Sequence, residues 1–141
     1  MYRYLALLTT LGISIAAPAA AGDLEIRIGG VSDGGGRVMV ALFDAAERFM
    51  DAETQTAALM LPARKGVVRA VIGDLPAGIY AISVYHDANG NQALDTNLLG
   101  MPREGYGFSN DARGIAGPPS FQAAAFEIGA DPAVVDLRLS Y

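Results

Sequence analysis

The chain of 141 residues contains no cysteine and a single histidine, His86. Without cysteine it can form no disulfide bond and carry no lipid on an N-terminal cysteine, so a hydrophobic core alone must hold the fold. A zinc site is unsupported as well, because zinc takes three or four strong ligands and no second histidine is present. We expect His86 to lie at the end of a strand and to bond a loop carbonyl.

Sequence motifs of nucleotide-binding proteins and serine hydrolases are missing. No G-x-G-x-x-G or Walker pattern occurs, and the segment GFSND around Ser109 does not match the G-x-S-x-G nucleophile motif. Positive charge is also scarce, with 10 lysine and arginine residues against 15 aspartate and glutamate residues. This balance argues against nucleic acid and anionic membrane surfaces as partners.

The first residues have the pattern of an export signal. One positively charged residue precedes an apolar stretch from Tyr4 to Ala17, and small residues follow. This arrangement predicts a secretory signal peptide over residues 1–21, with cleavage after Ala21 or, alternatively, after Ala19. A membrane anchor is the other interpretation, but a helix that crosses a bilayer needs about 20 apolar residues. We expect a mature domain over residues 22–141 in the periplasm or outside the cell, with no membrane span.

The remainder of the chain has the pattern of β-structure. No long window shows helical periodicity, and short apolar runs alternate with Gly, Pro, Asp and Asn. Seven strands are predicted, at residues 24–28, 37–43, 57–61, 67–72, 78–86, 124–128 and 133–139. We expect an all-β fold, namely a single seven-stranded antiparallel Ig-like or prealbumin-like β-sandwich with one long ordered loop over 88–120. The segment GADP at 129–132 is expected to join the last two strands as a hairpin.

Alternation within the strands predicts the core. The residues expected to point inward from the first and last strands are Leu24, Ile26, Ile28, Val135, Leu137 and Leu139. Tyr80 shares an inward face with Ile82 and Val84. The segment DLPAGIY before that face is typical of the tyrosine corner of Ig-like sandwiches, where the ring fills the core and the hydroxyl bonds nearby backbone.

The most unusual segment is YHDANGNQALDTN at 85–97, which places polar side chains at near-alternate positions behind a strand. Calcium takes six to eight oxygen ligands, and alternate side chains on a curling loop converge on one point. In an alignment with a calcium-binding loop, the ligands at positions one, three, five, seven and nine are Asp87, Asn89, Asn91, the Ala93 carbonyl and Asp95. The segment therefore predicts a calcium site.

Departures from that loop leave a second interpretation open. Position twelve is Leu98 where a bidentate glutamate is usual, and Gln92 occupies the glycine position six. Glu104 or Asp111 could complete the ligand shell from further along the chain. Alternatively, the Asp and Asn side chains bond their own backbone in an Asx-rich turn that needs no ion.

Three longer segments of the chain resemble a known family. The segments are H-D-x-N-x-N-x-x-L-D-x-N at 86–97, G-x-P-x-E-G-Y-G-F-S-N at 100–110 and G-P-P-S-F at 117–121. They are similar to the exported bacterial family known as domain of unknown function 2141. The resemblance implies an exported small β-sandwich with no established activity. Gln92 stands where a glycine is common in that family.

Two classes of function remain open at this point. The first is a non-enzymatic periplasmic binding or accessory protein of unknown ligand, whose long loop is a recognition element and binds calcium or forms a turn. The second is a loop-based hydrolase that uses Asp87, Asp95, Glu104 and His86 as acid–base groups. The sequence offers no activated nucleophile, so we expect the first.

Overall fold

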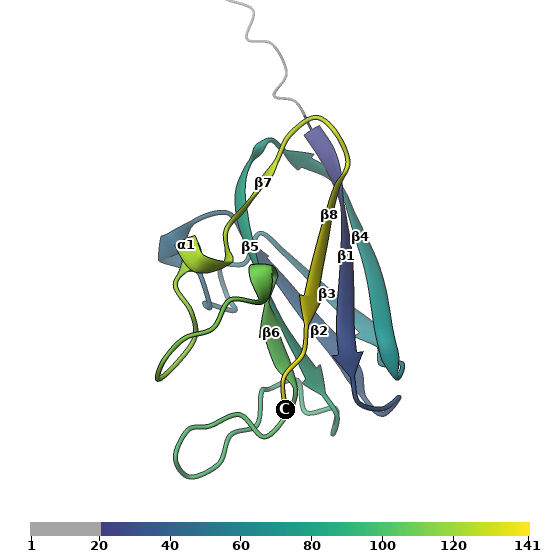
Figure 1. Cartoon of the computed structure of the whole chain (residues 1–141), viewed down its shortest axis with the longest axis vertical. Helices are drawn as coiled ribbons and strands as arrows, with labels where there is room; N and C mark the ends of the chain where they lie inside the picture. Colours follow the sequence, from purple (N-terminus) through teal and green to yellow (C-terminus); the bar gives the residue numbers. More distant parts are fainter. Residues whose placement is uncertain (1–20) are drawn as a thin grey trace, which may run out of the picture.

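The computed structural model describes residues 21–141 and shows two β-sheets packed face to face (Figure 1). The eight strands are β1 (Ala21–Val31), β2 (Arg37–Phe43), β3 (Ala57–Pro62), β4 (Gly66–Pro76), β5 (Gly78–Asp87), β6 (Tyr106–Phe108), β7 (Phe126–Ile128) and β8 (Ala133–Arg138). One sheet has the order β4-β1-β8, and the other has the order β3-β2-β5-β6 with β7 paired to β5. Three short helical segments lie in the connections, namely η1 (Ala46–Arg48), η2 (Ser109–Asp111) and α1 (Phe121–Ala124).

The signal-peptide prediction falls outside the described residues, apart from Ala21, which opens β1. Within residues 21–141, no helix is long and apolar enough to cross a membrane.

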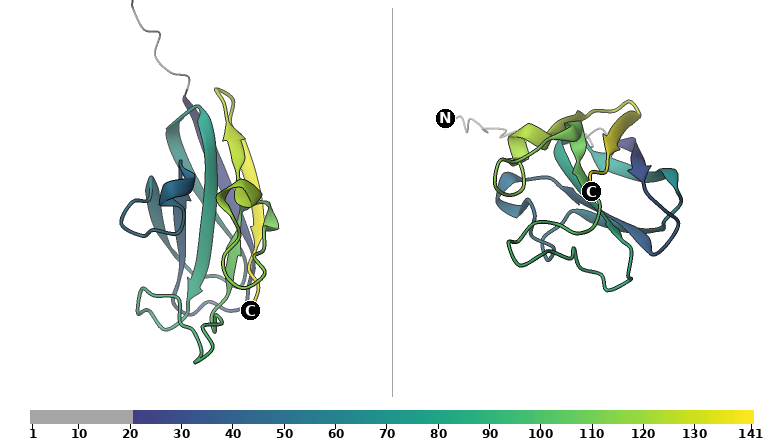
Figure 2. Two further views of the ribbon diagram at one scale, coloured as in Figure 1. Left: turned by 90° about the vertical axis from the view of Figure 1, so that its left-hand side faces the viewer. Right: turned by 60° about the horizontal axis from the view of Figure 1, so that its bottom comes forward.

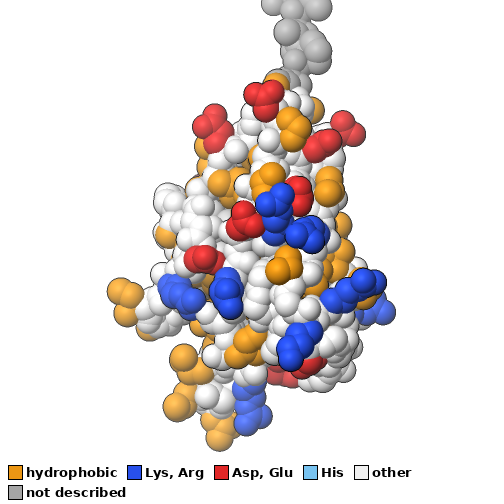
Figure 3. All heavy atoms as spheres, turned by 45° about the vertical axis from the view of Figure 1, so that its right-hand side comes forward, with side chains coloured by type: hydrophobic (Ala, Val, Ile, Leu, Met, Phe, Trp, Pro, Cys, Tyr) orange, Lys and Arg blue, Asp and Glu red, His pale blue; other side chains and the backbone are white. Residues whose placement is uncertain are grey.

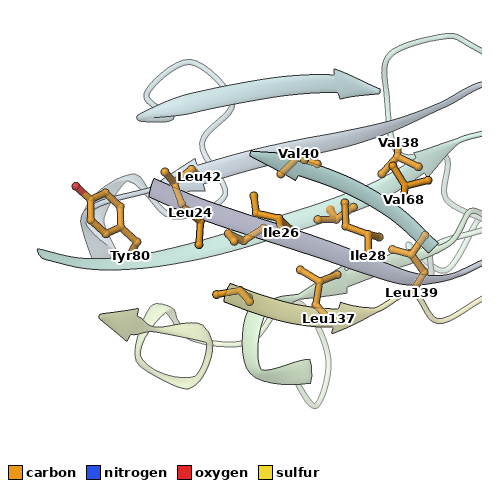
Figure 4. Close-up of a cluster of buried hydrophobic side chains, with 14 of the residues drawn as sticks. Leu24, Ile26, Ile28, Val38, Val40, Leu42, Val68, Tyr80, Leu137 and Leu139 are labelled. Atoms are coloured by element: carbon orange, nitrogen blue, oxygen red, sulfur yellow. The ribbon is translucent and has the colours of Figure 1, made fainter. Parts of the chain in front are cut away.

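The core lies between the two sheets and confirms the predicted alternation (Figure 4). Leu24, Ile26 and Ile28 are fully buried, and the residues between them face outward. Burial of each such side chain contributes about 1.5–3 kcal/mol relative to exposure. Leu137 on β8 is buried against the same cluster.

Tyr80 closes one end of this core (Figure 4). Its ring is buried with Ile82 and Val84 on the predicted face of β5. The hydroxyl donates a hydrogen bond to the carbonyl oxygen of Pro76 at 2.7 Å. Burial raises the pKa of this hydroxyl, so it stays a donor at physiological pH. The predicted tyrosine contact to nearby backbone is therefore confirmed.

The count of seven strands was one too low, because β6 lies inside the segment predicted to be loop. Three residues are too few for a local alternation to stand out, and long-range pairing fixes this strand. Ser83, Val84 and Tyr85 of β5 pair with Phe108, Gly107 and Tyr106. The strand predicted at 124–128 is also shorter, because Ala124 belongs to α1.

Two predicted pairings were wrong. The sandwich is not wholly antiparallel, since β1 runs parallel to β8 with Leu24 opposite Ala133 and Gly29 opposite Arg138. Nor do β7 and β8 form a hairpin, because β7 pairs with β5 and the following segment crosses to the other sheet (Figure 1). Alternation has the same period in parallel and antiparallel strands, so the sequence pattern could not distinguish these arrangements.

The long connection after β5 projects from one end of the sandwich (Figure 2). The second half of this connection returns over the sheet, where Phe49 packs against it. The ring centroid of Phe49 lies 5.8 Å from that of Phe121 and 6.2 Å from that of Phe108. Ser109 is fully buried, accepts the N–H of Ile82 and donates to the carbonyl of Ala124. The Ser109 hydroxyl therefore links β5 to α1 through these two hydrogen bonds.

Candidate functional site

Asp87 ends β5 and anchors the polar loop, which is the connection over residues 88–105 between β5 and β6. Its carboxylate is fully buried. Oδ1 accepts the backbone N–H groups of Gly90 at 2.9 Å and Asn91 at 3.1 Å, and Oδ2 accepts that of Gln92 at 2.9 Å. These bonds turn the chain back over the strand end, where Gln92 takes a left-handed φ of 62°. Gly36 makes room for this turn, since a Cβ there would lie 1.9 Å from the Asp87 carbonyl oxygen.

The other predicted ligands form a second hydrogen-bonded group. The side-chain amides of Asn89 and Asn91 both donate to the carboxylate of Asp95, the second at 2.9 Å. The Oδ1 atoms of the two asparagines accept the N–H groups of Asn91 at 3.1 Å and Ala93 at 3.0 Å. Side chains that accept N–H groups two residues further on are the contacts of Asx turns.

The structure thus brings Asn89, Asn91 and Asp95 together and directs the Asp87 carboxylate to the backbone. Because these oxygens accept N–H groups of the loop, a calcium ion would have to replace several hydrogen bonds to gain six to eight ligands. Across the described part of the chain, no three His, Asp or Glu side chains are grouped so that they could hold a metal ion. Calcium binding at these residues stays a prediction.

Glu104 braces the loop from the opposite side. Its carboxylate is mostly buried, with Oε1 accepting the N–H of Ala88 at 2.9 Å and Oε2 accepting that of Asp95 at 3.1 Å. One side chain therefore ties both limbs of the loop together. Asp111, the other residue considered for a ligand shell, bonds the N–H of Arg138 at 2.8 Å.

His86 lies next to this loop and is almost completely buried. Its Nε2 lies 2.7 Å from the carbonyl oxygen of Gly35, which confirms the expected bond to a loop carbonyl. Its Nδ1 lies 3.0 Å from the hydroxyl of Tyr141, and that hydroxyl accepts the N–H of Ser32 at 3.0 Å. The histidine therefore connects the C-terminal residue to the loop between β1 and β2.

An apolar groove of about 490 Å³ lies on the outer face of β3, β2 and β5. Strand register explains the hollow. Ala58, Ala41 and Ser83 lie side by side across the three strands, so a row of small side chains forms the floor. The next row is large, with Met39 between Met60 and Tyr85.

The groove has a wall on each side of this floor. One wall is the connection between β2 and β3, which contributes Met50, Ala52 and Gln55. The other is the polar loop, which contributes Gln92 and Leu94. Leu94 lies half-buried over the outer surface of the sheet. No lining residue carries a formal charge.

Tyr85 supplies the groove with a hydroxyl that stays uncharged. Burial raises the pKa of this hydroxyl, and the nearby carboxylates of Asp87 and Glu104 raise it further. The group therefore remains protonated at physiological pH and can donate a hydrogen bond. The place and shape of the groove could not be predicted from the sequence, because its floor is assembled from three strands whose register cannot be read from one chain segment.

Comparison with protein families matches residues 26–136 to the family described as "Uncharacterized protein conserved in bacteria (DUF2141)". The chain belongs to the DUF2141 family. The match confirms the resemblance noted from the sequence motifs, and it spans both the polar loop and the groove. Neither the curated proteins nor the solved structures contain a match to this DUF2141 chain.

Proposed function

We propose that this DUF2141 protein is an exported, non-enzymatic binding protein that holds an uncharged, largely apolar small molecule in the outer groove. The observation that carries the proposal is the groove itself, with its volume of about 490 Å³ and uncharged lining. Small-molecule sites typically enclose about 300–1,000 Å³ and combine apolar walls with a few polar groups. Here Gln55, Ser83, Tyr85 and Gln92 supply those groups.

The polar loop acts in this proposal as an ordered wall of the binding site. The Asp87 carboxylate accepts the backbone N–H of Gln92, and the Glu104 carboxylate accepts that of Asp95. These two bonds fix the backbone on both sides of Leu94. A binding loop on a rigid scaffold loses less conformational entropy when a ligand arrives. A calcium ion bound at Asp95 would stabilise this same wall of the groove.

The alternative hydrolase would use Asp87, Asp95, Glu104 and His86. Their surroundings favour the binding function. Asp87 and Glu104 are buried and accept backbone N–H groups, and His86 is buried between Gly35 and Tyr141. A general acid or base must reach a substrate proton, whereas these groups are engaged with the fold.

Two finer points belong to the same proposal. The contact of the Tyr80 hydroxyl with Pro76 supports an Ig-like sandwich, in which such a corner is common.

Export to the periplasm or the medium rests on the signal-peptide pattern of residues 1–21. N-terminal sequencing of the secreted protein should give Gly22 or Ala20 as the first residue, and an intact Met1 would contradict export by cleavage.

Two fluorescent probes with related ring systems test the proposed function. N-phenyl-1-naphthylamine is uncharged, whereas 8-anilinonaphthalene-1-sulfonate carries a negative charge. We expect the uncharged probe to bind saturably, one molecule per chain, and the sulfonate to bind at least about tenfold more weakly, a difference of 1.4 kcal/mol. Equal affinity for both probes, or no saturable binding of the uncharged one, would refute the proposal.

A matched pair of variants locates the probe. Ala58→Glu places a carboxylate in the exposed floor of the groove, and Val67→Glu places one at an exposed position on β4 in the other sheet. Ala58→Glu should weaken the uncharged probe by about tenfold or more, because a charge is costly beside an apolar ligand. Val67→Glu should leave the affinity unchanged. Equal affinities in the two variants would place the probe elsewhere.

A further inference from the structure

The polar loop carries a second feature, an apolar tip, which the groove does not use. Residues 96–102 form a small hairpin in which Thr96 bridges Pro102. Its turn exposes Leu98, Leu99 and Met101 at 106%, 86% and 58% of their full areas. Three adjacent large apolar side chains at such exposure mark an interaction site more often than ordinary surface.

The tip is held rigidly in this exposed position. The side-chain oxygen of Asn97 accepts the N–H groups of Leu99 at 2.9 Å and Met101 at 3.0 Å. The N–H of Asn97 donates to the carbonyl of Met101 at 2.8 Å, and Gly100 takes the positive φ that the turn requires. The N–H of Arg103 then bonds the carbonyl of Asp95 at 2.7 Å. These bonds fix the shape of the hairpin, in which both leucines are exposed.

Charge is distributed unevenly between the two ends of the molecule. At the end that bears the hairpin, the exposed charged side chains in and beside the loops are Arg37, Arg64, Lys65, Arg103 and Asp33. Carboxylates within the polar loop are withdrawn, since Asp87 and Glu104 are buried and Asp95 is bonded to two amides.

Acidic residues gather at the opposite end of the sandwich. Asp23 and Asp74 lie beside each other where β1 begins and β4 ends, and Glu127 and Asp131 lie on and after β7. Figure 3 shows red side chains mainly at this end, and blue side chains next to orange ones at the other. The net negative charge of the chain thus conceals a positive, apolar end.

We propose that the hairpin tip inserts into the headgroup region of a phospholipid bilayer, with the surrounding basic side chains on the headgroups of anionic lipids. Interfacial binding of this kind grows with the apolar area buried and with attraction to anionic lipid. The acidic end then points away from the membrane, which orients the domain. The sequence alone predicted no attraction to anionic surfaces, because a net charge does not reveal where the charges lie.

Flotation with lipid vesicles tests this proposal on the full mature protein. One set of vesicles contains phosphatidylcholine alone, and the other contains about 30% phosphatidylglycerol. We expect the unmutated protein to float with the mixed vesicles, and Leu98→Ser/Leu99→Ser to lower the partition coefficient about tenfold. Arg103→Gln should weaken binding to the mixed vesicles and leave binding to phosphatidylcholine unchanged. Circular dichroism checks that each variant is folded.

A matched control is Val71→Ser/Val134→Ser, which removes two exposed apolar side chains from strands β4 and β8. This variant should bind vesicles as the unmutated protein does. Equal loss in both double variants, or unchanged binding in Leu98→Ser/Leu99→Ser, would overturn the proposal. If the unmutated protein floats with neither vesicle, the bilayer proposal is wrong and the tip is left as a contact for a protein partner.

Discussion

Replacing Asp87 by asparagine tests whether the buried carboxylate holds the polar loop. The substitution keeps the shape of the side chain but removes its charge and replaces one oxygen by a nitrogen donor. Two of the three hydrogen bonds then have a neutral acceptor, and the third is lost because an N–H faces an N–H. Asp95→Asn is the control, since Asp95 accepts mainly from two exposed side-chain amides.

The expected cost follows from these bonds. A hydrogen bond to a charged acceptor contributes about 2 kcal/mol and one to a neutral acceptor about 1 kcal/mol. Weakening two bonds and losing one gives about 4 kcal/mol, and the lower cost of burying an amide offsets part of it. We therefore expect Asp87→Asn to lower the free energy of unfolding by about 3 kcal/mol, and Asp95→Asn by less than about 1 kcal/mol.

Urea unfolding followed by far-UV circular dichroism measures both values, since the chain has no tryptophan. With a slope of about 1–3 kcal/mol per molar urea, the midpoint should fall by about 1 M or more in Asp87→Asn. Hydrogen exchange should also quicken in the loop, most of all at Gln92, whose N–H loses its acceptor. A loss below about 0.5 kcal/mol, the range of ordinary surface changes, would refute the anchoring role, as would equal losses in the two variants.

Three further predictions concern the core, the turn and calcium. Tyr80→Ala should lower the free energy of unfolding by about 3–5 kcal/mol in the same urea assay. Tyr80→Phe should lower it by about 1 kcal/mol, because it removes only the hydrogen bond to Pro76. A loss under about 1 kcal/mol in the alanine variant would contradict the core assignment. Gln92→Gly should stabilise the fold by up to about 1 kcal/mol, because glycine adopts the left-handed φ without strain, while a lower stability would show that the Gln92 side chain contributes more than its backbone costs. If the loop oxygens hold calcium, the melting temperature should rise in millimolar calcium and Asp95→Ala should abolish the rise. At 100 times the dissociation constant a ligand specific for the folded state adds about 2.7 kcal/mol, so identical melting curves in calcium and in chelator would rule the ion out.

The parts of the fold that could be predicted are those with local alternation. Leu24, Ile26 and Ile28 in β1 and Tyr80, Ile82 and Val84 in β5 lie on the faces expected from a period of two. The short strand β6 and the parallel pairing of β1 with β8 depend on contacts between distant segments. No local pattern encodes such contacts, so they were missed.

The polar segment follows the end of β5, as its place behind a strand-like run predicts, but the contacts of its side chains could not be derived from spacing. Alternate Asp and Asn side chains can converge on an ion or accept N–H groups of the same loop, and both need the same residues. The choice at Asp87 depends on the backbone amides of Gly90, Asn91 and Gln92, which the chain positions only after it folds. The groove is a similar case, because the alanines of β2 and β3 form a floor only in register.

Methionine methyl groups give the most direct measurement of ligand binding in the groove. The four methionines after Met1 divide into two sets, since Met39, Met50 and Met60 line the groove and Met101 lies on the loop tip. The protein is labelled with ¹³C at the methionine methyls and titrated with N-phenyl-1-naphthylamine while carbon–proton spectra are recorded. The expected result is that the signals of the first three methyl groups shift together and saturate while that of Met101 stays in place. A shift confined to Met101, or no shift of the three groove signals at saturating probe, would contradict the assignment of the groove as the binding site.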